Sequence, residues 1–184
     1  MEAGVTNKWV SSLEEVTDFI EDSRLLDLLN YWSEKRVGRI PPSRQKIDPS
    51  EIGALLSCIY LVDFEEPDVF RYRVAGTEIA ETFGHGNLKG KTLDDILSQR
   101  GRDFVTNRWL PVIREAAVVC MKGQVYNTMN RYAFGERLLL PLADDPDGPV
   151  TGLLGLTVSR WMDASGPEGH RNSDMILIKA AKLP

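Results

Sequence analysis

A chain of 184 residues is long enough for one domain of roughly 110 to 150 residues and a flanking element. Its net charge of −5 argues against a sequence-independent grip on nucleic acid, and no apolar run is long enough to span a membrane. The first residues lack the order of a secretion signal, and Cys58 and Cys120 lie far apart without metal-ligand spacing, so we expect a cytoplasmic globular protein with two free thiols.

Two amphipathic helices are predicted near the N-terminus, over residues 11–20 and 23–35. The second carries an apolar stripe whose members recur at spacings of three and four: Leu25, Leu28, Leu29 and Trp32. This stripe can cover the sheet of its own chain, or it can pair with the same helix of a second chain. We expect a homodimer with these four residues at its interface, since symmetric dimers are common among soluble oligomers.

The segment after these helices is predicted to be extended, because Pro41 and Pro42 cannot continue a helix. A further short helix then opens, with Asp48 as its cap and Pro49 in its first turn. The segment carries a basic run of Arg36, Arg39, Arg44 and Lys46. These side chains either lie in solvent or clamp the segment onto acids such as Asp63, Glu65 and Glu66.

From residue 57 the apolar pattern changes to that of strands, over residues 58–64 and 69–75, joined by a hairpin loop. The second strand runs through Gly76 into a helix over 77–83. Gly76 is expected to supply backbone freedom at this corner, and Thr77 to cap the helix.

The remaining pattern predicts a short helix over 92–97 and a long helix over 102–118, bent at Pro111. Three strands follow, over residues 125–132, 136–143 and 152–161, with a connection at Ala133-Phe134-Gly135. Residues 163–174 are polar and contain glycine, so they are predicted to form a mobile tail. Residues 175–178 either add a strand or have no regular structure. This order predicts an α+β fold: one five-stranded antiparallel sheet with short helices on one face and the N-terminal helices on the other.

Several short sequence pieces occur in a recognisable order: Leu29-Asn30-Tyr31-Trp32, Gly38-Arg39-Ile40-Pro41, Ser43-Arg44, Ile47-Asp48-Pro49 with Ile52, Tyr72-Arg73-Val74-Ala75-Gly76-Thr77, Phe83-Gly84 and Gly90. In this order and spacing they resemble the single-domain PAS proteins of alphaproteobacteria. The resemblance implies a sensor fold rather than a reaction. It divides the chain into a helical extension and linker (1–50), a PAS-like sensor domain (51–162) and a C-terminal tail (163–184).

Cofactor motifs of PAS domains are not found. Haem-binding members usually offer a histidine from the long helix, whereas the histidines here are His85 in a turn and His170 in the tail. Light-sensing members place a reactive cysteine in a Gly-Arg-Asn-Cys-Arg-type helix, and neither cysteine has such neighbours. The acidic turn at 144–148 lacks the other ligands of a calcium loop. We therefore expect no cofactor and no metal.

A small-molecule pocket is predicted between the long helix and the sheet, with Arg73 as a cation for a carboxylate or phosphate. Its expected lining is Trp109, Ile113, Tyr126, Thr128, Leu140 and Leu156. The alternative is that the lining residues are plain core and that Arg73 pairs with an acid of the protein.

These observations favour a cytosolic sensor or adaptor of signal transduction that binds a small ligand or a regulatory protein, without catalysis. One alternative is a protein-binding scaffold with a filled core and no ligand. Another is an enzyme on a cone-shaped α+β fold, such as an isomerase or dehydratase. That enzyme would need a buried acid without a partner, for which Asp63 and Glu136 are the candidates.

Overall fold

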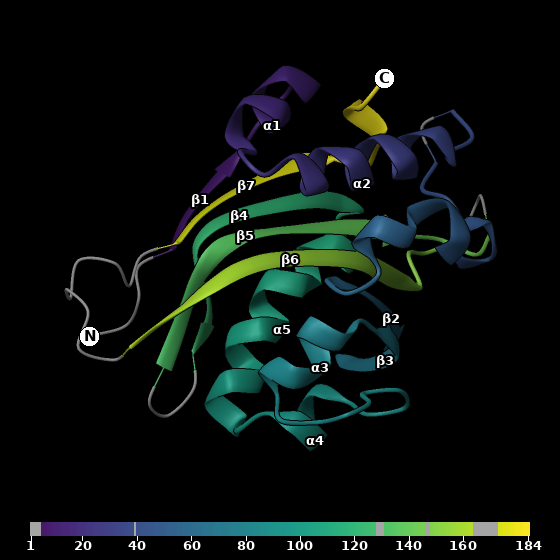
Figure 1. Ribbon diagram of the computed structural model, residues 1–184. Coiled ribbons are helices and arrows are strands. Elements are labelled where there is room, and N and C mark those ends of the chain that lie inside the picture. Colours follow the sequence, from purple (N-terminus) through teal and green to yellow (C-terminus); the bar gives the residue numbers. More distant parts are fainter. Residues whose placement is uncertain (1–4, 39, 128–130, 146–147, 164–172) are drawn as a thin grey trace.

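A seven-stranded mixed sheet forms the middle layer of the protein (Figure 1). The computed structural model describes residues 5–38, 40–127, 131–145, 148–163 and 173–184. The spatial order of the strands is β1-β7-β4-β5-β6-β2-β3, and neighbours are antiparallel except for the parallel pair of β1 and β7. The strands are β1 (Val5–Trp9), β2 (Ile59–Glu65), β3 (Val69–Ala75), β4 (Ala117–Asn127), β5 (Arg131–Leu142), β6 (Gly152–Asp163) and β7 (Ser173–Lys179).

The predicted α+β fold is confirmed, and its five antiparallel strands are β2 to β6. Two strands extend the sheet beyond β4. β7 has four consecutive buried residues, Met175 to Ile178, because it is covered on both faces. Residues 173–179 are therefore part of the sheet rather than of a tail. Strand β1 was not predicted from the sequence, because its alternation of apolar and polar side chains is short and most of its residues are polar.

Two predicted boundaries in the second half of the chain are wrong. The long helix, α5 (Gln99–Arg114), ends before residue 118, and β4 begins at Ala117 after Ala116 adopts a positive φ of 46°. The predicted turn at Ala133-Phe134-Gly135 lies inside β5. A Cβ on Gly135 would lie 1.9 Å from the carbonyl oxygen of Val158, so this glycine marks close packing between strands and not a turn.

The N-terminal helices α1 (Leu13–Phe19) and α2 (Ser23–Glu34) cover one face of the sheet (Figure 1). The side chain of Ser12 caps α1, and that of Asp22 caps α2. Trp32 donates its indole N–H to the carbonyl oxygen of Pro141 at 2.9 Å. All four residues of the apolar stripe, Leu25, Leu28, Leu29 and Trp32, are at most 1% exposed in this core. The stripe covers its own sheet, so its assignment to a dimer interface is wrong.

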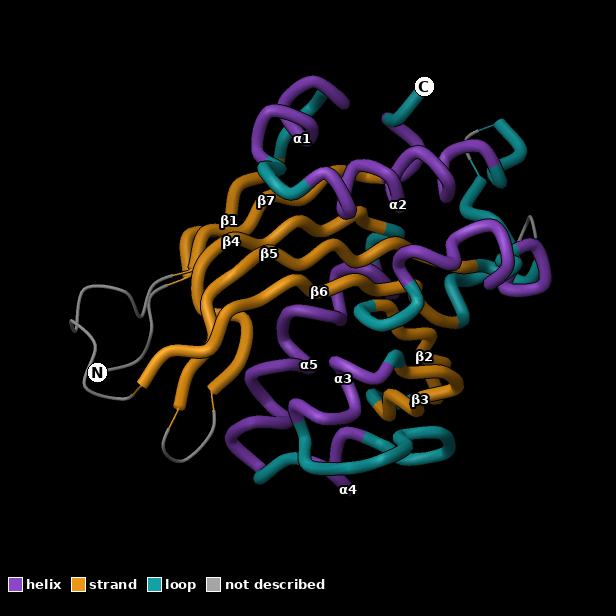
Figure 2. The backbone as a smooth tube through the Cα atoms, in the orientation of Figure 1, coloured by secondary structure: helices purple, strands orange, loops and turns teal. Residues whose placement is uncertain are grey.

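The opposite face carries α3 (Thr77–Thr82), α4 (Leu93–Ile96) and α5, as the tube in Figure 2 shows. Gly76, rather than Thr77, occupies the cap position of α3 and has an ordinary φ of −63°. A Cβ on Gly76 would lie 2.2 Å from the carbonyl oxygen of Leu56. The corner needs glycine because another part of the backbone approaches it, and not because it needs an unusual φ.

The linker between α2 and β2 contains two 3-10 helices, η1 (Arg44–Lys46) and η2 (Pro49–Leu55). Asp48 caps η2 as predicted, accepting a 2.8 Å hydrogen bond from the Ser50 amide. Arg44 forms a 2.6 Å ion pair with Asp63, so for this residue of the basic run the clamp onto β2 holds rather than the solvated alternative. In the part of the chain that is described, no helix is both long and apolar enough to cross a membrane.

Candidate functional site

The candidate site lies between α5 and the sheet, where an aromatic core surrounds Trp109 of α5. Its indole stacks on the ring of Tyr60 from β2 at 5.6 Å between centroids and meets the rings of Phe70 and Tyr72 from β3 edge-on. All four side chains are at most 2% exposed. Burial raises the pKa of Tyr60 to about 12, so this phenol stays neutral at physiological pH.

Arg137 of β5 enters this aromatic core from the sheet. It is 3% exposed, and its guanidinium lies 4.9 Å from the ring centroid of Tyr126. Its Nε donates to Thr157 Oγ1 at 2.9 Å, and its Nη2 donates to the carbonyl oxygen of Val125 at 3.0 Å. The strand register shifts between Gln124 and Tyr126, so a bulge at Val125 accompanies this contact.

Arg108 enters from the helix and is 6% exposed. Its guanidinium lies 3.3 Å from the centroid of the Phe104 ring, one turn earlier, and its Nη1 donates to the Phe104 carbonyl oxygen at 2.9 Å. Its Nε and Nη2 atoms are buried with no hydrogen-bond partner among the described residues. Burial, together with repulsion from Arg137, lowers the pKa of Arg108 to about 10. The two arginines, here called the arginine pair, are thus electrostatic neighbours, and both remain charged at pH 7.

No carboxylate of the described residues forms a salt bridge with the arginine pair. The hydrogen-bond partners of Arg137 are a hydroxyl and a carbonyl, and that of Arg108 is a carbonyl. Trp109 Nε1 is also buried, and no described residue accepts a hydrogen bond from it. The unpartnered groups on Arg108 and Trp109 are all donors, because a guanidinium and an indole have no acceptor atom. The site is therefore positive and rich in donors, a chemistry that suits binding of acceptor groups.

The predicted pocket residues divide between the two faces of the sheet. Trp109, Ile113 and Tyr126 lie on the α5 side, as expected. Leu140 and Leu156 are fully buried on the α2 side, in the same core as Trp32, so their assignment to the pocket is wrong. Both strands are apolar at odd and even positions, so alternation could not tell which face each leucine takes. Thr128 lies outside the described residues.

Arg73 does not reach the α5-side core. Its side chain is 54% exposed and pairs with Asp63, the acid that also binds Arg44. This pairing is the alternative that the sequence analysis left open for Arg73. The second acid considered for catalysis, Glu136, accepts from the Glu21 and Asp22 amides and pairs with Lys122 at 3.3 Å on the α2 side. Both acids therefore have partners outside the α5-side core.

Sequence reasoning missed the arginine pair, although the sequence contains a signal for each member. Arg137 directly precedes three leucines in a strand that is apolar on both faces, which indicates burial of the arginine as well. Arg108 adjoins Trp109 on the apolar side of α5. A charge at such a position is informative, because a buried charge needs a partner.

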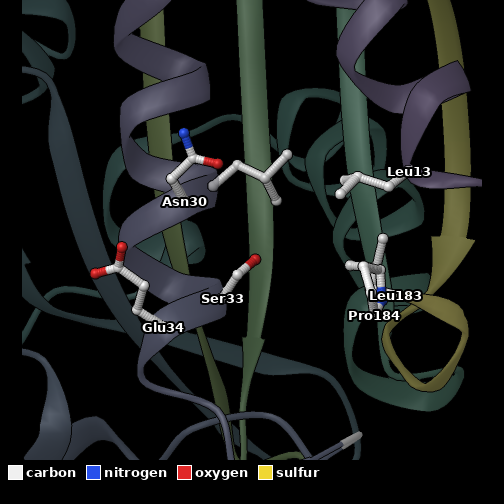
Figure 3. A pocket seen from close by; sticks show the side chains of 7 residues that line it. Leu13, Asn30, Ser33, Glu34, Leu183 and Pro184 are labelled. Carbon is white, nitrogen blue, oxygen red and sulfur yellow. The ribbon is translucent and has the colours of Figure 1, made fainter.

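A separate surface hollow of about 250 Å³ lies on the α2 side, next to the C-terminus (Figure 3). Its lining is Leu13, Leu29, Asn30, Ser33, Glu34, Leu183 and Pro184. The hollow is on the opposite face of the sheet from the arginine pair, so it is not the predicted pocket.

Comparison with known proteins identifies the family of the chain. The sequence profile described as PAS domain matches residues 20–158, which include α2, η2, β2 to β5 and both members of the arginine pair. No curated protein and no solved structure matches the chain. The profile covers most of the chain and agrees with the antiparallel order of β2 to β6, so this protein belongs to the PAS domain family.

Proposed function

We propose that this PAS domain is a cytosolic sensor or adaptor of signal transduction that binds a small molecule between α5 and the sheet, without catalysis. PAS domains are commonly sensory or signalling modules. The observation that carries the proposal is a set of buried donors that find no partner among the described residues: Nε and Nη2 of Arg108 and Nε1 of Trp109. Native proteins pair almost all buried polar groups, so three such donors on two neighbouring residues of α5 support a bound molecule over plain core.

Co-purification gives the first test. We expect native mass spectrometry of freshly purified protein to show a small molecule that is lost on denaturation. We also expect members of a small-molecule library to raise the melting temperature, because a ligand of the folded state stabilises it by mass action. A protein that carries no small molecule and responds to no library member would instead match the filled-core scaffold.

A homodimer also remains part of the proposal, but it needs another contact surface. The stripe on α2 is buried in its own chain, whereas Trp9 at the sheet edge and Val74 on β3 are 50% and 42% exposed. Light scattering at high micromolar concentration measures the oligomeric state, and a monomer there would contradict this part of the proposal.

A further inference from the structure

Two buried arginines without an acid are electrostatically costly in a folded protein. An ion that leaves water loses its hydration, and the loss is recovered only by good geometry with a charge of opposite sign. Arg108 and Arg137 are both more than nine-tenths buried, and each repels the other because they carry the same charge. The partners of Arg137 at Nε and Nη2 are a hydroxyl and a carbonyl, and neither carries a negative charge.

The free edge of Arg108 has a defined shape. Nε and Nη2 present parallel N–H groups that match the two oxygens of a carboxylate. The same edge binds a carboxylate at two exposed sites of this protein. Arg24 donates from Nε and Nη2 to the two Asp22 oxygens at 2.9 and 2.7 Å, and Arg71 does so to Glu65 at 2.7 and 3.2 Å. On Arg108 this edge is buried and has no protein partner among the described residues.

From this geometry we infer that the ligand of the α5-side site is a small organic carboxylate, held side-on by Nε and Nη2 of Arg108 with Arg137 as a second positive charge. This inference rests on the proposed function and specifies its ligand class. Phe104 lies against the Arg108 guanidinium and Tyr126 against that of Arg137, and these rings favour an apolar or aromatic body on the carboxylate over a fully hydrated anion. Tyr126 is half-buried, and its ring also contacts those of Phe83 and Trp161.

Matched pairs of probes test the charge requirement on the full chain. The pairs are acetate with acetamide, benzoate with benzamide, and phenylacetate with phenylacetamide, and sodium chloride and inorganic phosphate serve as plain anions. We expect at least one carboxylate to raise the melting temperature in a concentration-dependent manner, and its amide to have no effect. Equal shifts from carboxylates and amides would overturn the inference while leaving the small-molecule sensor intact. A response to neutral library members alone would do the same, and no response to any compound would sink both.

The variant Arg108→Gln separates binding from structure. We expect it to weaken binding of whichever carboxylate is active by about tenfold or more, because hydrogen bonds from a charged group are lost. We also expect its melting temperature without ligand to equal or exceed that of the unchanged protein, because the substitution removes a buried charge that has no acidic partner among the described residues. The control Arg71→Gln removes an exposed guanidinium, and its melting temperature should rise with carboxylate as much as that of the unchanged protein. A response to carboxylate that survives in Arg108→Gln, or a response to phosphate equal to that to carboxylates, would contradict the assignment.

Discussion

Arg108 carries a buried charge with no acidic partner among the described residues, and this combination gives a prediction about pH. The pKa of Arg108 in the folded protein, about 10, is below its usual value of 12.5. The cost of burying its charge is therefore fully present below pH 10 and diminishes as pH rises from there towards 12.5. We expect the unfolding free energy of the unchanged protein to rise relative to that of Arg108→Gln between about pH 9 and about pH 11. Urea unfolding at both values measures the difference, and a constant difference would show that the cation is not desolvated.

Gly135 is a residue whose missing side chain matters. A Cβ at this position would lie 1.9 Å from the Val158 carbonyl oxygen in the neighbouring strand β6. We expect Gly135→Ala to lower the unfolding free energy by about 2 to 4 kcal/mol, because neither strand can move without breaking its pairing. Gly53→Ala is the matched control, since no atom lies within 4 Å of its Cβ position. Urea unfolding of both variants tests the contrast, and equal stabilities would refute the close packing.

At the scale of elements, a buried carboxylate fastens α2 to the sheet. Glu136 of β5 is 8% exposed and accepts hydrogen bonds of 3.0 to 3.1 Å from the amides of Glu21 and Asp22, at the start of the helix. The negative charge also suits the positive end of α2. Since Arg137 is the next residue and lies on the other face, β5 connects the candidate site to the N-terminal helices.

Neutralising this carboxylate should loosen α2. We expect Glu136→Gln to lower the unfolding free energy by about 1 to 3 kcal/mol, because an amide is a weaker acceptor and leaves Lys122 with one carboxylate fewer. Glu21→Gln is the control: its side chain is 80% exposed and binds the same Lys122 at 2.8 Å, so a change of less than about 0.5 kcal/mol is expected. Chemical denaturation compares the two, and an equal loss in both would disprove the anchoring role.

The linker clamp gives a further prediction for an element. Asp63 binds both Arg44 of the linker and Arg73 of β3, and its side chain is 15% exposed. We expect Asp63→Asn to expose the linker around Arg44 to trypsin, with a several-fold faster first cleavage, because local opening becomes easier. Glu65→Gln, which removes only the exposed pair with Arg71, should leave this rate unchanged. Limited proteolysis followed by mass spectrometry locates the cut, and identical rates would exclude the clamp.

At the scale of the whole molecule, the order of helices and strands was enough to predict the fold class and strands β2 to β6, whereas β1 was not predicted and β7 was left open. The helices α1 and α2, the hairpin of β2 and β3 and the two helical layers all follow from apolar periodicity and caps, as at Ser12 and Asp48. Boundaries were predicted less well. Gly135 suggested a turn, although it lies within β5 and is needed there for close packing. The first residues of β4 are apolar and also suit the end of a helix, so the predicted helix extended too far.

The candidate site was only partly predictable for a related reason. Trp109 and Ile113 follow from the apolar side of α5, whereas Leu140 and Leu156 could not be placed on a face, because their strands are buried on both sides. The arginine pair depends on tertiary structure: α5 and β5 bring Arg108 and Arg137 together from positions that are distant in the sequence. The sequence left Arg73 open as a ligand cation or as the partner of an acid, and only the assembled sheet shows that it is exposed and pairs with Asp63.

The most direct measurement of the central claim is an NMR titration of the full chain, labelled with ¹⁵N-arginine, with benzoate and then with phenylacetate. The side-chain Nε–H signals of Arg108 and Arg137, assigned by substitution, report hydrogen bonding at each guanidinium. We predict that a carboxylate shifts these two signals in a saturable manner while the Arg24 signal stays in place and the amide analogues have no effect. Unchanged signals for the arginine pair with both carboxylates, or equal shifts at Arg24, would contradict the account.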